Sequence, residues 1–213
     1  MKSRDVKCEL ENDFEAWRAG EILYIVKDNK KREEINDRKL TEFEPDQADF
    51  TYIAKDVTLD FDQQIPISEA IPYTKTAYIP KRIRVKVNAP IMLTQNHANK
   101  KLREDGISNG NRGFVTRIDF SNKPGEVNQI KIIWVEFYDK SGLLYKAEMK
   151  RKRNLHNPDP FSIPIVPINQ TFTLDTNKLK YRRTGIPLIL GFCHTAFKIQ
   201  ASMISNKFFC KYY

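Results

Sequence analysis

The stretch ILYIVKDNKKREEINDRKL, residues 22–40, decides the fold of this 213-residue chain. It opens with five consecutive apolar residues, a short run that is typical of a buried parallel strand. Asp28 or Asn29 can cap the helix that follows, because both side chains accept hydrogen bonds from backbone N–H groups. We expect this helix to run to about Leu40, with Ile35 and Leu40 facing the core. A strand followed by a capped helix is half of a βαβ unit and predicts an α/β domain.

The segments on either side extend this pattern. Residues 8–19 place Leu10, Phe14 and Trp17 at helical spacing, and Gly20 ends that pattern. Trp17 is expected in the core. On the other side, residues 50–59 alternate and predict a second strand.

The pattern of predicted elements changes after a connector at residues 63–80, which is rich in proline. Several short strands with turn signals between them are predicted, at residues 83–87, 90–93, 114–118, 129–138, 143–145 and 163–168. Trp134 and Phe137 are expected in the core of this part. Such a series is typical of a small β-barrel or sandwich.

The last segment returns to the α/β style. Residues 186–192 (IPLILGF) form an apolar run that predicts a buried strand. Thr195 can cap a following helix, whose apolar members include Phe197. The order of patterns is therefore α/β, then β, then α/β, which predicts an α/β fold with an inserted β-barrel.

The charge balance favours a polyanionic partner. Lys and Arg total 36 against 27 Asp and Glu, a net charge of +9. Basic runs gather in the second half, at residues 146–153 (KAEMKRKR) and 178–183 (KLKYRR). Nucleic acid is such a partner, because cations neutralise its phosphates and release counterions. The alternative is a basic, solvated surface without a partner.

Other functional classes are not favoured. Cys8, Cys193 and Cys210 are the three cysteines, and no two have the CxxC spacing of a zinc site. The histidines are scattered, so no metal site is expected. No apolar stretch approaches the roughly 18 residues of a membrane span, and the start of the chain has no signal-peptide core. We therefore expect an intracellular protein, nuclear or cytoplasmic, without a membrane partner.

The chain also lacks the loop that binds ATP phosphates. The usual device is GxxxxGK[ST] after a strand, with a carboxylate that holds magnesium. None of the eight glycines is followed by lysine. We expect no cofactor in this chain and no catalytic residue for ATP hydrolysis.

Three segments, in this order, resemble the Pif-type (petite integration frequency) superfamily-one DNA helicases. In the first, residues 22–40, Ile35, Asn36 and Leu40 resemble the family's "-iN-L" pattern, and residues 50–56 resemble its "tY.a.D" continuation. The second, residues 83–115, resembles "l.lkvGapVMLl.N.....gl.NGtrG.V". It matches at Val87, Ala89, Pro90, Met92, Leu93, Asn96, Gly106, Asn109, Gly110, Arg112, Gly113 and Val115. Asn88 stands where the family usually has glycine.

The third segment, residues 183–204, resembles "RtQfPl.laya.TahKiQGqTi". It matches at Arg183, Thr184, Pro187, Leu188, Phe192, Thr195, Ala196, Lys198, Ile199, Gln200 and Ile204. Departures fall at Gly185 for glutamine, Phe197 for histidine, Ala201 for glycine and Met203 for threonine. Together the three segments and their connections cover nearly the whole chain.

The resemblance implies part of the second RecA-like motor domain of such a helicase, carrying a small Src-homology-3-like barrel. The implied boundaries are residues 1–82 and 176–213 for the motor domain, which would be incomplete, and 83–175 for the barrel. In the family, ATP and magnesium drive DNA unwinding through a first motor domain.

The resemblance also implies where single-stranded DNA is held. Thr195 can donate its hydroxyl to a phosphate, Lys198 can supply a cation, and Gln200 can bond a phosphate, sugar or base edge. Asn96, Asn109 and Gly110 are further candidates, although Asn-Gly is first of all a signal for a tight turn. Phe197 can stack on a base or lie in the core, and we favour the core.

Four interpretations follow. The first is a helicase fragment that keeps elements contacting single-stranded DNA. The second is a stand-alone basic nucleic-acid-binding module or an inactive mobile-element relic. The third is a subunit whose missing motor domain comes from a second chain. An unrelated small structural protein is the least favoured, because three segments match in family order.

Overall fold

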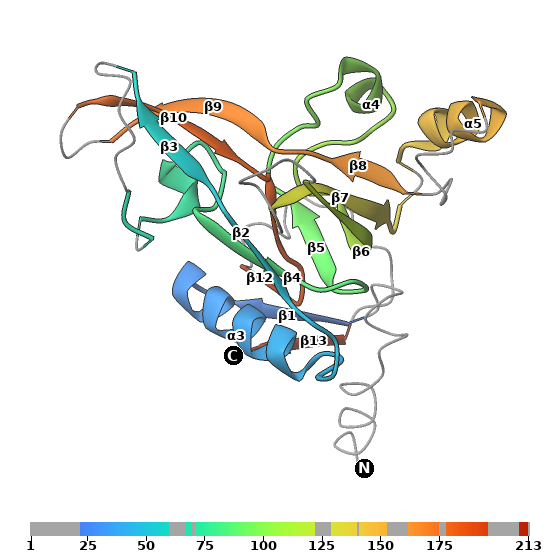
Figure 1. Cartoon of the computed structure of the whole chain (residues 1–213). Helices are drawn as coiled ribbons and strands as arrows, with labels where there is room; N and C mark the ends of the chain where they lie inside the picture. Colours follow the sequence, from blue (N-terminus) through green and yellow to red (C-terminus); the bar gives the residue numbers. More distant parts are fainter. Residues whose placement is uncertain are drawn as a thin grey trace, which may run out of the picture.

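The structure, a computed structural model, describes residues 22–59, 67–69, 71–121, 129–139, 141–152, 162–174, 178–195 and 209–212. In chain order its elements are β1 (Ile22–Val26), α3 (Asn29–Glu42), β2 (Phe50–Ile53), β3 (Lys55–Thr58), the 3₁₀ turn η1 (Tyr73–Lys75), β4 (Arg82–Val85), β5 (Pro90–Leu93), α4 (Lys100–Glu104), β6 (Arg112–Phe120), β7 (Ile130–Phe137), α5 (Leu143–Lys152), β8 (Ile163–Ile165), β9 (Ile168–Thr173), β10 (Lys180–Gly185), β11 (Leu188–Leu190), β12 (Cys193–Thr195) and β13 (Phe209–Tyr212). Figure 1 shows their arrangement. The helix expected at residues 8–19, with Trp17, lies outside the described residues.

A small parallel sheet holds β1 between β12 and β13. Val26 pairs with Thr195 on one side, and Tyr24 pairs with Lys211 on the other. Leu23 and Tyr24, on opposite faces of β1, are each 1% exposed. Burial of both faces explains why the strand is a continuous apolar run rather than an alternating one. The predicted buried parallel strand is therefore confirmed.

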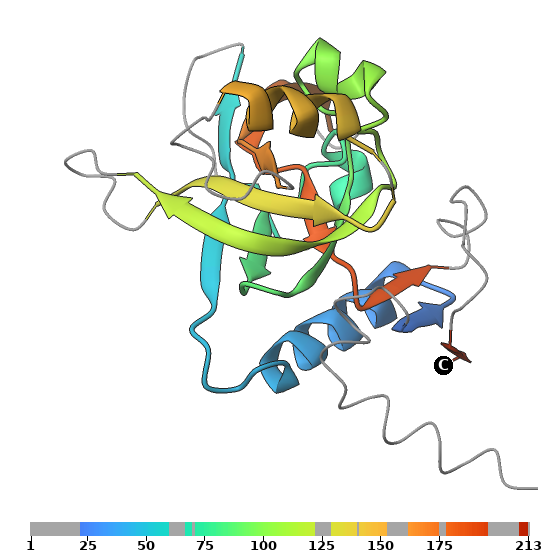
Figure 2. The same cartoon turned by 90° about the vertical axis from the view of Figure 1, so that its right-hand side faces the viewer.

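Helix α3 packs beside this sheet (Figure 2). Asp28 is its N-cap and accepts a hydrogen bond from the Lys31 backbone N–H at 2.8 Å. Ile35 and Leu40 are buried, as predicted, and the helix ends two residues beyond the expected end. After it, Phe43 packs edge-on against Phe192, with ring centroids 5.4 Å apart. The predicted strand and capped helix are both confirmed.

The main core lies in the β-rich part. Strands β11, β5, β6, β7 and β8 form one antiparallel sheet in that order, β2 pairs with β4, and β3, β10 and β9 form a further sheet. Trp134 and Phe137 are 6% and 3% exposed, so their predicted burial is confirmed. Within the described residues no sheet closes into a barrel. The architecture is thus mixed α/β with several sheets, and the predicted barrel is not found as a closed structure.

Residues 50–59 form two strands that serve different sheets. β2 pairs with β4, and β3 pairs with β10, with Ala54 at the change. The Ala54 N–H donates to the Lys81 carbonyl at 2.8 Å, so the run stays extended across the break. In Figure 1 it appears as one long diagonal from the helix to the outer sheet.

Two expectations need correction. Residues 143–145 were predicted to be a strand but begin helix α5, in which Leu143 and Leu144 are 52% and 74% exposed. Three apolar residues are too few to distinguish the two periodicities, and the good helix formers that follow decide the outcome.

The apolar run at residues 186–192 contains a buried strand, but it pairs antiparallel with β5. The chain rejoins the β1 sheet only at Cys193, and the proposed domain limit at residue 176 stays a prediction.

Candidate nucleic-acid interface

Thr195 lies at the carboxyl edge of the parallel sheet. Its strand ends there beside Val26, so the β1–α3 connection and the chain after Thr195 leave the sheet at the same edge. Thr195 is 8% exposed. In open α/β sheets, ligands bind outside the carboxyl ends of the strands. Lys198 and Gln200 follow in the sequence but lie outside the described residues, as does Phe197, so their roles stay predictions.

A polar stripe on α3 faces the β-rich part. It consists of Asn29, Arg32 and Asn36, which are three and four residues apart and so share one face of the helix. The Asn36 amide donates to the Cys193 carbonyl at 3.2 Å and accepts from the Cys193 N–H at 2.8 Å. This pair of hydrogen bonds fastens the helix to the strand that carries Thr195.

Arg32 connects the same helix to the 3₁₀ turn. It is 3% exposed, and its Nη1 donates to Asn29 Oδ1 at 2.7 Å and to the Tyr73 hydroxyl at 3.3 Å. The guanidinium also lies over the Tyr73 ring, 5.0 Å from its centroid. Burial raises the pKa of Tyr73, and Arg32 opposes that shift. Burial likewise raises the pKa of Cys193 to about 12, so this thiol is not a nucleophile near neutral pH.

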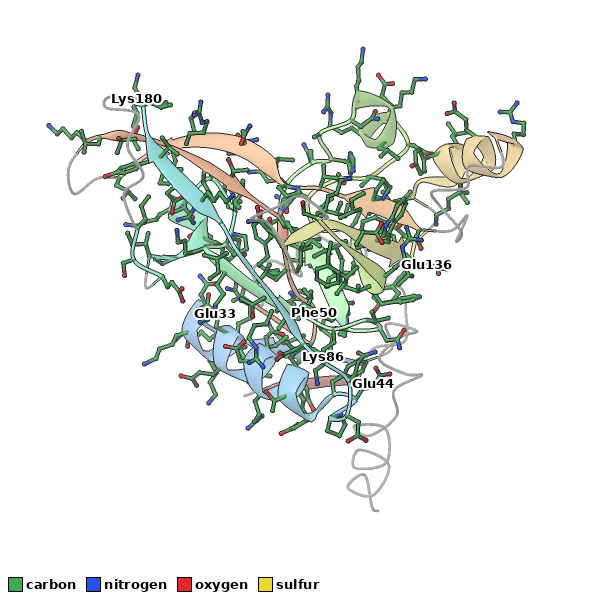
Figure 3. The ribbon with its side chains drawn as sticks, viewed as in Figure 1. Glu33, Glu44, Phe50, Lys86, Glu136 and Lys180 are labelled. Atoms are coloured by element: carbon green, nitrogen blue, oxygen red, sulfur yellow. The ribbon has the colours of Figure 1, made fainter. Side chains whose placement is uncertain are left out.

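A groove of about 690 Å³ runs between α3, η1, β4 and β11. Its apolar lining comes from β11 and from Ile71, Pro72, Pro80 and Ile83. Its charged lining consists of five cations, Lys30, Arg32, Lys81, Arg82 and Arg84, and three carboxylates, Glu33, Asp37 and Glu69. Figure 3 shows Glu33 on the side of α3 that faces the strands above. Among these lining side chains the cations outnumber the carboxylates, although Arg84 and Lys81 pair with Asp49 and Asp56 outside the lining. The volume suits a small ligand or a short stretch of a chain.

The cations of this groove differ in how firmly they are held. Lys81 is bound to the buried Asp56 at 2.8 Å and serves the fold. Arg82 reaches Glu69 only at 3.6 Å, between side chains that are 53% and 54% exposed. Such a surface pair contributes little energy and can exchange for a phosphate. Lys30 is exposed at the start of α3.

The structure brings Asn96, Asn109 and Gly110 together at the end of β5, and we call this group the Asn96 turn. The Asn109 N–H donates to Asn96 Oδ1 at 3.0 Å. The Gly110 N–H donates to the Leu93 carbonyl at 2.8 Å, and Gly110 has φ +96°, which favours glycine. The tight turn expected for Asn-Gly is confirmed. Asn96 and Asn109 are exposed, so their outer faces are accessible.

The Asn96 turn is linked to the groove by contacts within the protein. The Gln95 side chain donates to the Ala77 carbonyl, just after η1. Tyr73, which lines the groove, packs in one cluster with Met92 and Ile189. Thr195, by contrast, is placed on the parallel sheet beyond α3. The predicted residues that the structure describes therefore form two groups, Thr195 on the parallel sheet and the Asn96 turn at the end of β5.

Sequence reasoning missed Arg32 and Tyr73, which are 41 residues apart along the chain. The available signal was the spacing of Asn29, Arg32 and Asn36, which puts polar side chains beside the buried Ile35. A polar stripe on the inner face of a helix has to find partners, because unsatisfied buried polar groups are costly.

Two departures from the Pif-type pattern have structural explanations. Asn88 has φ +65° in the place of the usual glycine, a conformation that asparagine tolerates better than most residues. A Cβ atom at Gly185 would lie 2.6 Å from Ile79 Cγ2 and 3.0 Å from Ala54 Cβ. The glutamine of the family would therefore not fit here without movement of the packed neighbours.

Other classes of site find no support among the described residues. They contain no group of three or more His, Cys, Asp or Glu side chains arranged to hold a metal ion. No helix among them has the length and apolar character needed to cross a membrane.

We compared the sequence and the structure with known proteins. No family model matches the sequence, and no curated protein does. Among solved structures, the Pif1 helicase of Candida albicans aligns with a TM-score of 0.57 and 16% identity over 95% of this chain and 41% of that one. The Bacteroides Pif1 bound to single-stranded DNA aligns at 0.51 and 19% over 89% and 34%, and a double mutant of Bacteroides Pif1 at 0.51 and 17% over 95% and 36%.

The chain thus spans well under half the length of these solved proteins. The resemblance inferred from three sequence segments is confirmed at the level of the fold, which is similar to that of part of a Pif1 helicase.

Proposed function

We propose that this chain is the strand-holding part of a Pif1-like helicase and binds single-stranded DNA along the groove between α3, η1 and β4. The observation that carries the proposal is the groove between α3, η1, β4 and β11, in whose lining five cations face three carboxylates. Proteins that hold single strands combine a basic groove with side chains that meet the bases. The ssDNA-bound neighbour of the same fold supports this choice of ligand.

We extend the proposal to the inserted domain, the DNA-contacting residues and the ATP site that the resemblance implies. The β-rich part, residues 83–175, would correspond to the Src-homology-3-like insertion of the family. Thr195, Lys198 and Gln200 would contact the DNA backbone, with Asn96, Asn109 and Gly110 at the far end of the groove. ATP and magnesium would be held by a first motor domain, in the same protein or in a second chain. The 213 residues alone are expected not to hydrolyse ATP.

The test is binding of a fluorescent oligothymidylate, followed by anisotropy over a series of salt concentrations. Log affinity is expected to fall linearly with log salt, with a slope of about −0.7 for each phosphate contacted. Lys30→Ala and Lys198→Ala should each weaken binding and reduce that slope by about 0.7. Lys131→Ala is the matched control, because Lys131 is exposed on β7, outside the groove lining.

Absence of binding at low salt would reject the proposal. Equal effects of Lys30→Ala and Lys131→Ala would also reject it, because they would show a diffuse charge effect instead of a groove.

A second candidate is a stand-alone basic module that uses the sheet formed by β3, β10 and β9. Exposure alternates along β10, so Lys180 and Arg182 point outward while Tyr181 and Arg183 are buried. Figure 3 shows Lys180 at the outer tip of this sheet. In this case the double variant Lys180→Ala, Arg182→Ala should weaken DNA binding more than Lys30→Ala does.

A further inference from the structure

Tyr78 is an exposed aromatic residue on a turn with an unusual backbone. Its side chain is 42% exposed, and it has φ +58°, next to Ala77 at φ +52°. Two consecutive non-glycine residues in the left-handed region are uncommon and cost conformational energy. The ring nevertheless keeps 42% of its surface exposed, beside the lining of the groove.

The turn that carries Tyr78 is firmly held from below. The Tyr78 N–H donates to the Tyr73 carbonyl at 2.9 Å. The buried Arg183 donates through Nη1 to Thr76 Oγ1 at 2.8 Å and to the Ile79 carbonyl at 2.9 Å. The residues on both sides of Tyr78 are thus anchored to the core, and the ring sits on a rigid support.

The position of the ring is also defined. Tyr73 and Pro80, on either side of it in the sequence, line the groove. The rings of Tyr73 and Tyr78 meet edge to face, with centroids 6.4 Å apart and planes at 74°. The Ala77 carbonyl accepts from Gln95, the neighbour of Asn96. The turn that carries Tyr78 therefore contacts both a ring that lines the groove and the residue before Asn96.

We propose that Tyr78 is a base-stacking residue that receives an unpaired nucleobase of a single strand whose phosphates follow the groove. This inference rests on the proposed function and names the contact that reads the strand as unpaired. An aromatic face stacks on any base, so it adds affinity without sequence preference, and a base inside a duplex is not available to it. A rigid support lowers the entropy lost when the base stacks.

The experiment compares two ligands of equal length, an oligothymidylate and an abasic oligonucleotide with the same phosphates. Tyr78→Ala is expected to weaken binding of the oligothymidylate about 5- to 100-fold and to leave binding of the abasic strand unchanged. Tyr78→Phe should bind both as the unmodified protein does. Lys30→Ala should weaken both ligands alike, since it acts on phosphates.

A second variant guards against a folding defect. Tyr78→Gly also removes the ring, and glycine adopts the positive φ without strain. This variant should fold at least as well as Tyr78→Ala and show the same selective loss of oligothymidylate binding. The inference is overturned if both variants bind the oligothymidylate as tightly as the unmodified protein, or if they lose both ligands equally. If the unmodified protein binds neither ligand, the proposed function itself fails.

Discussion

Arg183 is fully buried, and its guanidinium group makes its hydrogen bonds to groups inside the protein. Its Nε and Nη2 donate to the two carboxylate oxygens of Asp56, at 2.6 and 3.0 Å. Its Nη1 holds the turn that carries Tyr78. The resemblance to the Pif-type pattern includes this arginine, and the pattern alone does not say what the side chain does. Burial assigns it to the fold.

Replacing Arg183 should therefore destabilise the protein strongly. Arg183→Met would leave the buried Asp56 with Lys81 as its remaining cationic partner, and breaking a buried pair in this way costs about 3–5 kcal/mol. The control is Arg182→Met on the neighbouring, exposed position, expected within about 0.5 kcal/mol of the unmodified protein. Urea denaturation measures both free energies of unfolding. Similar values for the two variants would contradict the assignment.

At the scale of the element, α4 and the segment before it depend on a neutral histidine. His97 Nδ1 accepts from the Asn99 N–H at 3.0 Å, so Nε2 carries the proton and donates to the Pro164 carbonyl, also at 3.0 Å. Asn99 is in turn the N-cap of α4. Burial lowers the pKa of His97, and the nearby Arg103 lowers it further, against the hydrogen bond to Pro164.

The protein should accordingly lose stability in mild acid. Because the folded-state pKa lies below the unfolded value of 6.5, the unfolded chain takes up the proton first as the pH falls. The contribution of His97 is complete above about 6.5 and is lost as the pH falls through the lowered folded-state pKa. Urea unfolding at about pH 7.5 and about pH 5.5 measures it. His97→Gln should flatten this dependence, and an equal loss in both proteins would assign it to other groups.

Elements were predictable where the pattern was local and long. The five apolar residues of β1 and a cap at Asp28 or Asn29 are local signals that could be identified from the sequence, and the structure shows that Asp28 is the cap. The prediction for residues 143–145 failed because Leu143 and Leu144 remain exposed, so burial of these two side chains did not select the conformation. In the site, the Asn109-Gly110 turn was readable for the same local reason. The contact between Arg32 and Tyr73 was not, because it depends on how α3 packs against a turn 41 residues away.

At the scale of the whole molecule, the parallel sheet with α3 and the β-rich part form one unit. Asn36 joins the helix to Cys193. At the other end, the buried Lys86 donates to the Phe43 carbonyl at 2.8 Å and to the Glu44 carbonyl at 3.2 Å, just after α3. A cation at the carboxyl end of a helix satisfies carbonyls that have no partner within the helix.

Unfolding should therefore occur in one cooperative transition, and Lys86 should contribute to it. Lys86→Met removes the donor from two carbonyls and is expected to lower the free energy of unfolding by about 1–3 kcal/mol while the transition stays single. Lys131→Met, the same change at an exposed position of β7, is the control. Circular dichroism and tryptophan fluorescence should give coincident melting curves. Two separate transitions would show that the parts unfold independently.

The order in which the chain is synthesised determines when the strands of the parallel sheet can pair. β1 emerges before its partners, residues 193–195 and 209–212, so it has no strand to pair with until the whole β-rich part has also been synthesised. Strands β5, β6, β7 and β8 follow one another closely and can assemble long before that. During translation the apolar β1 therefore remains unpaired and can require a chaperone, while strands β5 to β8 can already pair.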